Sequence, residues 1–124
     1  MAISSEAPTL VGERFLEALG RHDYAAVAGC FTRDAKLRAV VPPGVREDEG
    51  PEAIAARFEG WTRDGELVEF EAGMFEDLLR LRFVIREVES EIGLSAYEQT
   101  AYAEVADGAI RRMRLACSGH RALG

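Results

Sequence analysis

The stretch LRLRFVIR, Leu79 to Arg86, decides the fold of this chain. Leucine, phenylalanine and isoleucine alternate in it with three arginines and a valine, which is the period of two of a strand with one buried face. The same period begins at Glu66 and returns in Ser95–Val105 and Ile110–Ser118. The second half of the chain is therefore predicted to be an antiparallel meander, with a hairpin turn at Asp107-Gly108.

Helical periodicity marks the beginning of the chain. Between Thr9 and Leu19 the apolar residues recur at steps of three and four, with Thr9 as the expected N-cap and Gly20 as the stop. Asp23 is well placed to cap a second helix over Tyr24–Phe31. These two helices are predicted to form a hairpin.

A strand, a loop and a third helix are expected next. Residues 35–41 alternate and are rich in branched side chains until Pro42-Pro43-Gly44, so they predict a short strand. The acidic run Glu47-Asp48-Glu49 is expected in the following loop. Pro51 at a first helical position then predicts a helix that closes at Asp64-Gly65.

Composition limits the classes of function. The 124 residues, 48% of them hydrophobic, can fill one core, so we expect a single domain over residues 1–124. A net charge of −7 argues against nucleic acid and against an anionic membrane as partners. We see neither a secretory signal nor an apolar run of about 18 residues, and therefore expect a cytoplasmic protein.

Cofactor and metal motifs are not found in the sequence. Cys30 and Cys117 form no C-x-x-C pair and stand among apolar residues, so both are predicted to be buried free thiols. The two histidines and two cysteines have no ligand spacing, and no glycine-rich phosphate loop or Gly-x-Ser-x-Gly elbow occurs. We expect no metal and no cofactor.

Several short motifs carry a resemblance to a known family. They are RFLEAL at 14–19 followed by His22-Asp23-Tyr24, FTRDA at 31–35 and GPEAI at 50–54. With YEQTAY at 97–102, DGAI at 107–110 and CSGHR at 117–121, the chain resembles bacterial members of the nuclear transport factor 2-like (NTF2-like) superfamily, in its SnoaL-like branch. The resemblance implies an α+β cone, in which a curved antiparallel sheet is covered by three helices from the N-terminal half, as in cystatin-like folds.

Strand alternation predicts which side chains point into the cone. The inward set, with the inward faces of the helices, outlines an apolar pocket for a small hydrophobic molecule. Its expected lining is Phe15, Leu19, Ala39, Phe58, Trp61, Leu81, Phe83, Tyr97, Gln99, Met113 and Leu115.

The resemblance leaves the question of catalysis open. Ketosteroid isomerases of this fold use a carboxylate base and an oxyanion hole of a tyrosine and a protonated aspartate. Matching the motifs puts Phe15, Ala39 and Ala101 at or near those positions, so the family's catalytic acids are replaced by apolar residues. Three functions remain open: a ligand-binding protein, an isomerase or cyclase acting on a polyketide-, steroid- or terpenoid-like substrate, and a pocketless homodimeric association domain.

The remaining candidates for chemistry are few. Tyr97 and Gln99 could orient a ligand or could satisfy buried hydrogen bonds near the rim. A slip of one residue in strand register would bring Glu98 and Tyr102 into the pocket in their place. His120, beyond the last strand, is a further candidate, with terminal packing as the simpler reading.

The outer face of the predicted sheet is charged. Its arginines, Arg80, Arg82 and Arg86, could pair with Glu98 and Glu104. Glu87 and Glu89 could likewise pair with the arginines at 111, 112 and 114. The face is either a solvated surface or a homodimer interface centred on Val84, Thr100 and Tyr102, because members of the superfamily commonly pair through this face.

Overall fold

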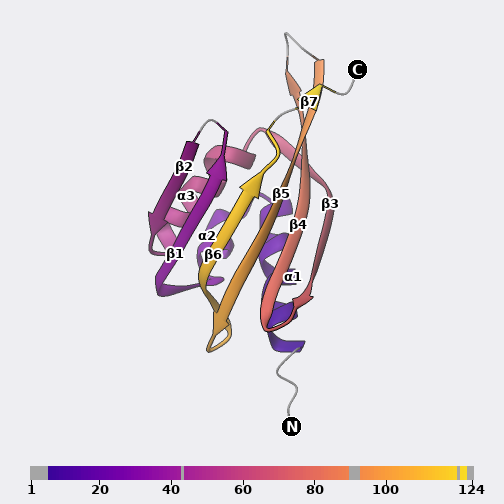
Figure 1. The fold of residues 1–124 in the computed structure, drawn as a ribbon. Coiled ribbons are helices and arrows are strands. Elements are labelled where there is room, and N and C mark those ends of the chain that lie inside the picture. The colour runs from indigo at the N-terminus through magenta and orange to yellow at the C-terminus, as the bar shows by residue number, and fades with distance from the viewer. Residues whose placement is uncertain (1–5, 43, 90–92, 120, 123–124) are drawn as a thin grey trace.

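The computed structural model of the protein describes residues 6–42, 44–89, 93–119 and 121–122. Three helices cover one face of a curved sheet, and the other face is left open (Figure 1). The elements are α1 (Glu6–Gly20), α2 (Tyr24–Ala28), β1 (Phe31–Val41), β2 (Gly44–Glu49), α3 (Pro51–Thr62), β3 (Gly65–Phe75), β4 (Leu78–Glu89), β5 (Gly93–Ala106), β6 (Ala109–Cys117) and β7 (Arg121–Ala122). The α+β class predicted from the sequence is confirmed.

The meander lies in one sheet whose strand order is β2-β1-β6-β5-β4-β3, with the short β7 paired to β5. Asp107 and Gly108 both have positive φ, at 54° and 77°, as the tight turn between β5 and β6 requires. One pairing differs from the all-antiparallel expectation, because β1 lies parallel to β6. This contact joins the two halves of the chain.

The boundaries in the first half need correction. The first helix begins at Glu6, so Thr9 lies inside it and is not its N-cap. Asp23 does cap α2, where it accepts a hydrogen bond from the Ala26 amide at 3.1 Å, but that helix already ends at Ala28. The acidic run at 47–49 belongs to strand β2 rather than to a loop, since it pairs with residues 36–38 of β1.

The core lies between the helices and the concave face of the sheet. Phe15 of α1 is fully buried and meets three other rings edge to face, Phe31, Phe58 and Phe83, at centroid distances of 6.0, 5.2 and 6.2 Å. At Gly12 a Cβ would lie 2.9 Å from side-chain atoms of both Leu79 and Leu81. This glycine lets α1 approach the sheet closely.

Strand register decides which polar residues face the helices. Gln99 of β5 lies opposite Phe83, and Tyr97 opposite Ile85, so both share the buried face. Glu98, Thr100 and Tyr102 lie on the outer face. The slip of one residue that would turn Glu98 inward does not occur.

Candidate functional site

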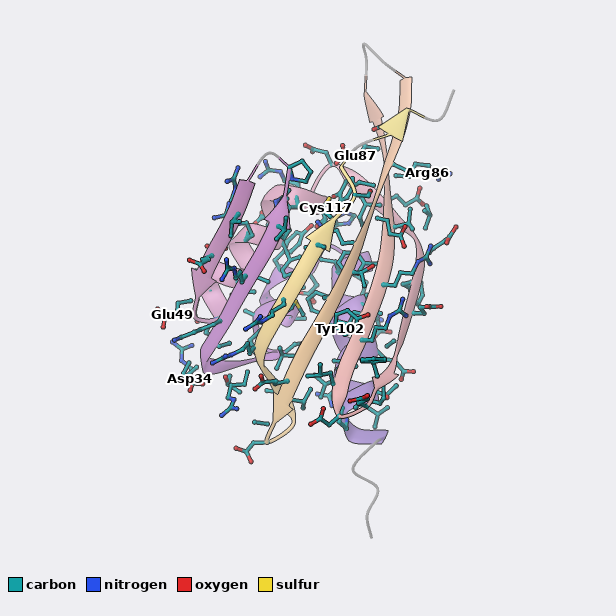
Figure 2. The ribbon with its side chains drawn as sticks, viewed as in Figure 1. Asp34, Glu49, Arg86, Glu87, Tyr102 and Cys117 are labelled. Carbon is teal, nitrogen blue, oxygen red and sulfur yellow. The ribbon has the colours of Figure 1, made fainter. Side chains whose placement is uncertain are left out.

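A pocket of about 440 Å³ opens at the end of the sheet where β1 and β6 finish and α3 ends. We call it the rim pocket. It is lined by Val41, Pro42, Gly60, Trp61, Glu87, Tyr97, Gln99, Cys117 and Gly119. Figure 2 labels Glu87 and Cys117, which lie at this end of the sheet.

The structure brings three of the eleven expected lining residues to this pocket: Trp61, Tyr97 and Gln99. The other eight belong to the buried core cluster and do not line it. They are Phe15, Leu19, Ala39, Phe58, Leu81, Phe83, Met113 and Leu115. Ala39, Ala101 and Phe15, which occupy the positions matched to catalytic groups of relatives, are all 0% exposed.

Gln99 is the most unusual polar group of the rim pocket. Its side chain is 1% exposed, and neither its amide nitrogen nor its amide oxygen has a hydrogen-bond partner among the described residues. Leaving a buried polar group unpaired costs about 1–3 kcal/mol. The two amide atoms together offer donors and an acceptor to a ligand in the pocket.

Tyr97, two residues away on the same face, has its hydroxyl group engaged. It donates a hydrogen bond of 2.5 Å to the main-chain oxygen of Trp61. Burial raises the pKa of the Tyr97 phenol, and the nearby Glu87 carboxylate raises it further. The group is therefore a neutral phenol whose donor is committed to the protein.

Glu87 supplies a carboxylate to the rim pocket, and sequence reasoning missed it. Its expected place is among the outer charges, paired with the arginines of β6, but it lines the rim pocket, and β5 lies between β4 and β6. The signal was present, because Glu87 continues the inward row of Phe83 and Ile85 by one further step of two residues.

The remaining candidates lie elsewhere. Glu98 faces outward and forms an ion pair with Arg82. His120 lies outside the described residues. The Nε2 atom of His22 lies 2.8 Å from the main-chain oxygen of Gly65 and so links the α1–α2 turn to the start of β3.

The described residues provide neither a metal site nor a helix that could span a membrane. In the described ranges no group of three or more His, Cys, Asp or Glu side chains is arranged to hold a metal ion. None of the helices in that part of the chain is long and apolar enough to cross a membrane.

Comparison with known proteins gives structural neighbours only. No family model and no curated protein matches the sequence. A proposed polyketide cyclase of Xanthomonas campestris pv. campestris superposes with a TM-score of 0.71 at 17% identity, over 90% of each chain. An LEH-like epoxide hydrolase of M. tuberculosis superposes with a TM-score of 0.70 at 17% identity, over 93% of this chain and 85% of its own. An NTF2-like protein of unknown function from Cytophaga hutchinsonii superposes with a TM-score of 0.62 at 15% identity, over 85% of this chain and 84% of its own.

Proposed function

Since the chain has the NTF2-like fold, we propose that it binds a small, largely apolar molecule in the rim pocket. The observation that carries the proposal is the buried, unpaired amide of Gln99. The pocket volume of about 440 Å³ suits a small ligand, because such sites usually span about 300–1,000 Å³. Ligand pockets also combine apolar walls with a few fixed polar groups, as Val41, Pro42 and Trp61 do here with Gln99.

The polar groups of the pocket suggest what the ligand carries. Gln99 can donate to a carbonyl oxygen and accept from a hydroxyl or amide hydrogen. Glu87 favours a ligand hydrogen-bond donor nearby. We therefore expect an apolar skeleton bearing a carbonyl or hydroxyl group, which is consistent with steroid-, terpenoid- or polyketide-like compounds.

Trp61 provides a direct test, since it is the only tryptophan of the chain and lines the pocket. Its fluorescence should change saturably when steroid, terpenoid or polyketide compounds are titrated into the protein. The same titration with Trp61→Phe controls for absorption by the compounds themselves. A flat response of folded protein across the whole panel would contradict the proposal.

The Glu87 carboxylate supports a second candidate function, an isomerase or cyclase. A carboxylate facing a bound carbonyl compound can take up a proton from the carbon beside the carbonyl, while a hydrogen bond from Gln99 stabilises the enolate oxygen. Glu87 and Gln99 could together carry out this proton transfer without a further acidic residue.

Proton exchange tests this second function without knowledge of the product. A ketone that binds in the fluorescence assay should lose its α-hydrogens to D₂O faster with the protein than without it, as followed by NMR. Glu87→Gln should abolish the acceleration, and Glu69→Gln, on the outer face, should leave it unchanged. Equal rates with wild type and Glu87→Gln would rule out Glu87 as the base.

We also propose that two copies pair through the outer face of the sheet, as the third candidate function requires. Phe75 and Tyr102 support this, since they are 54% and 38% exposed and contact each other edge to face at 5.9 Å. Exposed aromatic residues are enriched in interfaces. Sedimentation velocity should show a dimer that Tyr102→Lys dissociates; a wild-type monomer at high concentration would contradict the pairing.

A cytoplasmic location is proposed on the state of the cysteines. Cys30 and Cys117 are both free thiols. Free thiols are usual in reducing compartments, where disulfides are rare. Fractionation of cells that express the native chain tests this location.

A further inference from the structure

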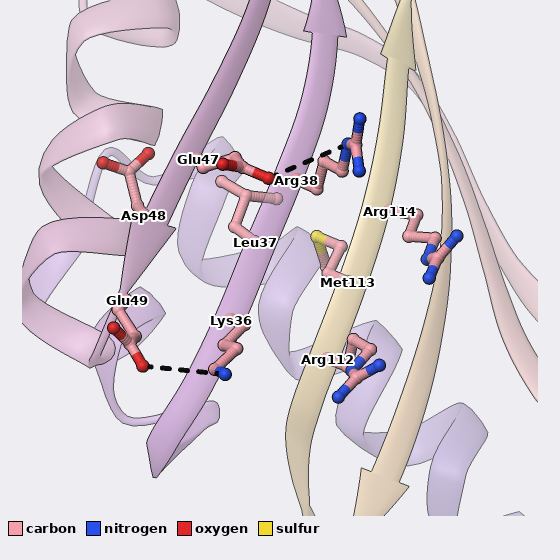
Figure 3. Close-up of a pocket in the computed structure, with 9 residues that line it drawn as sticks. All are labelled: Lys36, Leu37, Arg38, Glu47, Asp48, Glu49, Arg112, Met113 and Arg114. Carbon is pink, nitrogen blue, oxygen red and sulfur yellow. Dashed lines mark ion pairs between the residues drawn. The ribbon is translucent and has the colours of Figure 1, made fainter.

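A second depression lies on the opposite face of the sheet from the rim pocket, over strands β2, β1 and β6. It has a volume of about 450 Å³ and is shown in Figure 3. We call it the basic groove. Its lining is Lys36, Leu37, Arg38, Glu47, Asp48, Glu49, Arg112, Met113 and Arg114.

Four exposed cationic side chains meet in the basic groove. The parallel pairing of β1 with β6 sets Lys36 opposite Arg112 and Arg38 opposite Arg114. Like charges directly opposite on neighbouring strands are destabilising. The arrangement is therefore a local concentration of positive charge in a chain whose net charge is −7.

The acidic neighbours neutralise only one side of the groove. Glu49 lies 3.8 Å from Lys36 and Glu47 lies 3.9 Å from Arg38, and all four side chains are at least 60% exposed. Such loose, exposed pairs contribute little. The third acid, Asp48, is bound instead to Arg57 at 2.8 Å.

Among the described residues, the β6 side of the groove has no acidic partner of its own. Neither Arg112 nor Arg114 forms an ion pair with any residue that the structure describes. On the neighbouring strand β5, the residue opposite Arg112 is Glu104, which is bound to Arg111 at 3.1 Å, and the residue opposite Arg114 is Tyr102. Figure 3 shows ion pairs at Lys36 and Arg38 and none at the two arginines of β6.

From this geometry we propose that the basic groove binds a small oxyanion with two or more negative charges, held by Arg112 and Arg114. The planar guanidinium group donates paired hydrogen bonds to phosphate and carboxylate oxygens alike. Lys36 and Arg38, on the adjacent strand, contribute further positive potential. The inference is independent of the rim pocket, because the sheet lies between the two sites.

Calorimetric titration of the full chain with pyrophosphate and with citrate tests the proposal, at low salt and constant pH. Wild type should bind at least one of them saturably, with an affinity that falls as sodium chloride is added. The stronger of the two separates a phosphate from a carboxylate ligand. Arg112→Gln and Arg114→Gln should each weaken binding by about tenfold or more, because hydrogen bonds to charged groups are among the stronger ones.

Arg86→Gln is the matched control, since it removes the same charge from the same face of the sheet at a position outside the groove. It should leave the affinity unchanged. The proposal is overturned if neither anion binds wild type saturably, or if Arg86→Gln weakens binding as much as the groove variants. It is also overturned if no anion binds and the groove variants instead weaken self-association in sedimentation, since a second copy would then occupy the groove.

Discussion

The hydroxyl of Tyr97 donates a hydrogen bond to the main-chain oxygen of Trp61, 36 positions earlier in the chain. This contact ties strand β5 to the end of helix α3 and so fixes one wall of the rim pocket. Two further hydrogen bonds hold the same helix end, because Thr62 donates to the main-chain oxygen of Phe58 at 2.8 Å and its hydroxyl oxygen lies 2.7 Å from that of Tyr24. The pocket is therefore built on a fixed frame.

Replacing Tyr97 by phenylalanine should destabilise the protein. The change removes the hydroxyl and leaves the Trp61 oxygen without that donor, at a cost of about 1–2 kcal/mol in the free energy of unfolding. Urea denaturation measures the difference. Tyr102→Phe, on the exposed outer face, is the control and should cost less; equal losses would mean that the bond to Trp61 contributes nothing.

Stability should also fall at alkaline pH because of Tyr97. Burial raises the pKa of this phenol in the folded protein above its unfolded value, so its contribution is fully present below the unfolded pKa of about 10. Above that pH the unfolded chain loses the proton first and is favoured. Urea midpoints measured from pH 8 to 11 should decline less steeply in Tyr97→Phe than in wild type.

The ion pair between Asp48 and Arg57 should anchor β2 to α3. The Asp48 side chain is only 14% exposed and accepts from two nitrogens of Arg57, at 2.8 and 3.3 Å. Asp48→Asn is expected to lower the free energy of unfolding by about 1–2 kcal/mol, since bonds to charged groups are the stronger ones. Glu47→Gln, at a loose exposed pair on the same strand, should change it by about 0.5 kcal/mol or less.

The two thiols should differ in reactivity. Cys30 is buried, and its burial raises the pKa of the thiol, which leaves little thiolate at neutral pH. Cys117 is half-buried and lines the rim pocket. In native protein Ellman's reagent should modify Cys117 first, and Cys117→Ser should retain only the slow reaction. A bound ligand should protect Cys117.

Much of the fold follows from local sequence patterns. Period-two alternation around Phe83 predicts both the strand and its buried face, and the same rule places Tyr97 and Gln99 inward. One further step of two residues beyond Ile85 reaches Glu87, so the same rule also predicts that this carboxylate faces inward. The β2 strand was harder to predict, because an exposed edge strand such as Glu47-Asp48-Glu49 carries no apolar face to mark it.

Other features depend on contacts that no local pattern contains. The parallel pairing of β1 with β6 joins residues more than 70 positions apart. No local pattern could therefore predict that the like charges of Arg38 and Arg114 lie opposite each other. The filling of the expected pocket centre by Phe15 and Phe58 likewise depends on how closely α1 and α3 approach the sheet. The unpaired amide of Gln99 is visible only once every neighbour is in place.

The substitution Gln99→Met tests the central claim most directly, because it replaces the unpaired amide by an apolar side chain of similar length. Two quantities should be measured on it: the free energy of unfolding without ligand, and the affinity for a compound that changes Trp61 fluorescence. The account predicts that they move in opposite directions, with unfolding costing about 1–3 kcal/mol more and the affinity falling about tenfold. A less stable variant, or one that binds the compound as tightly as wild type, would contradict it.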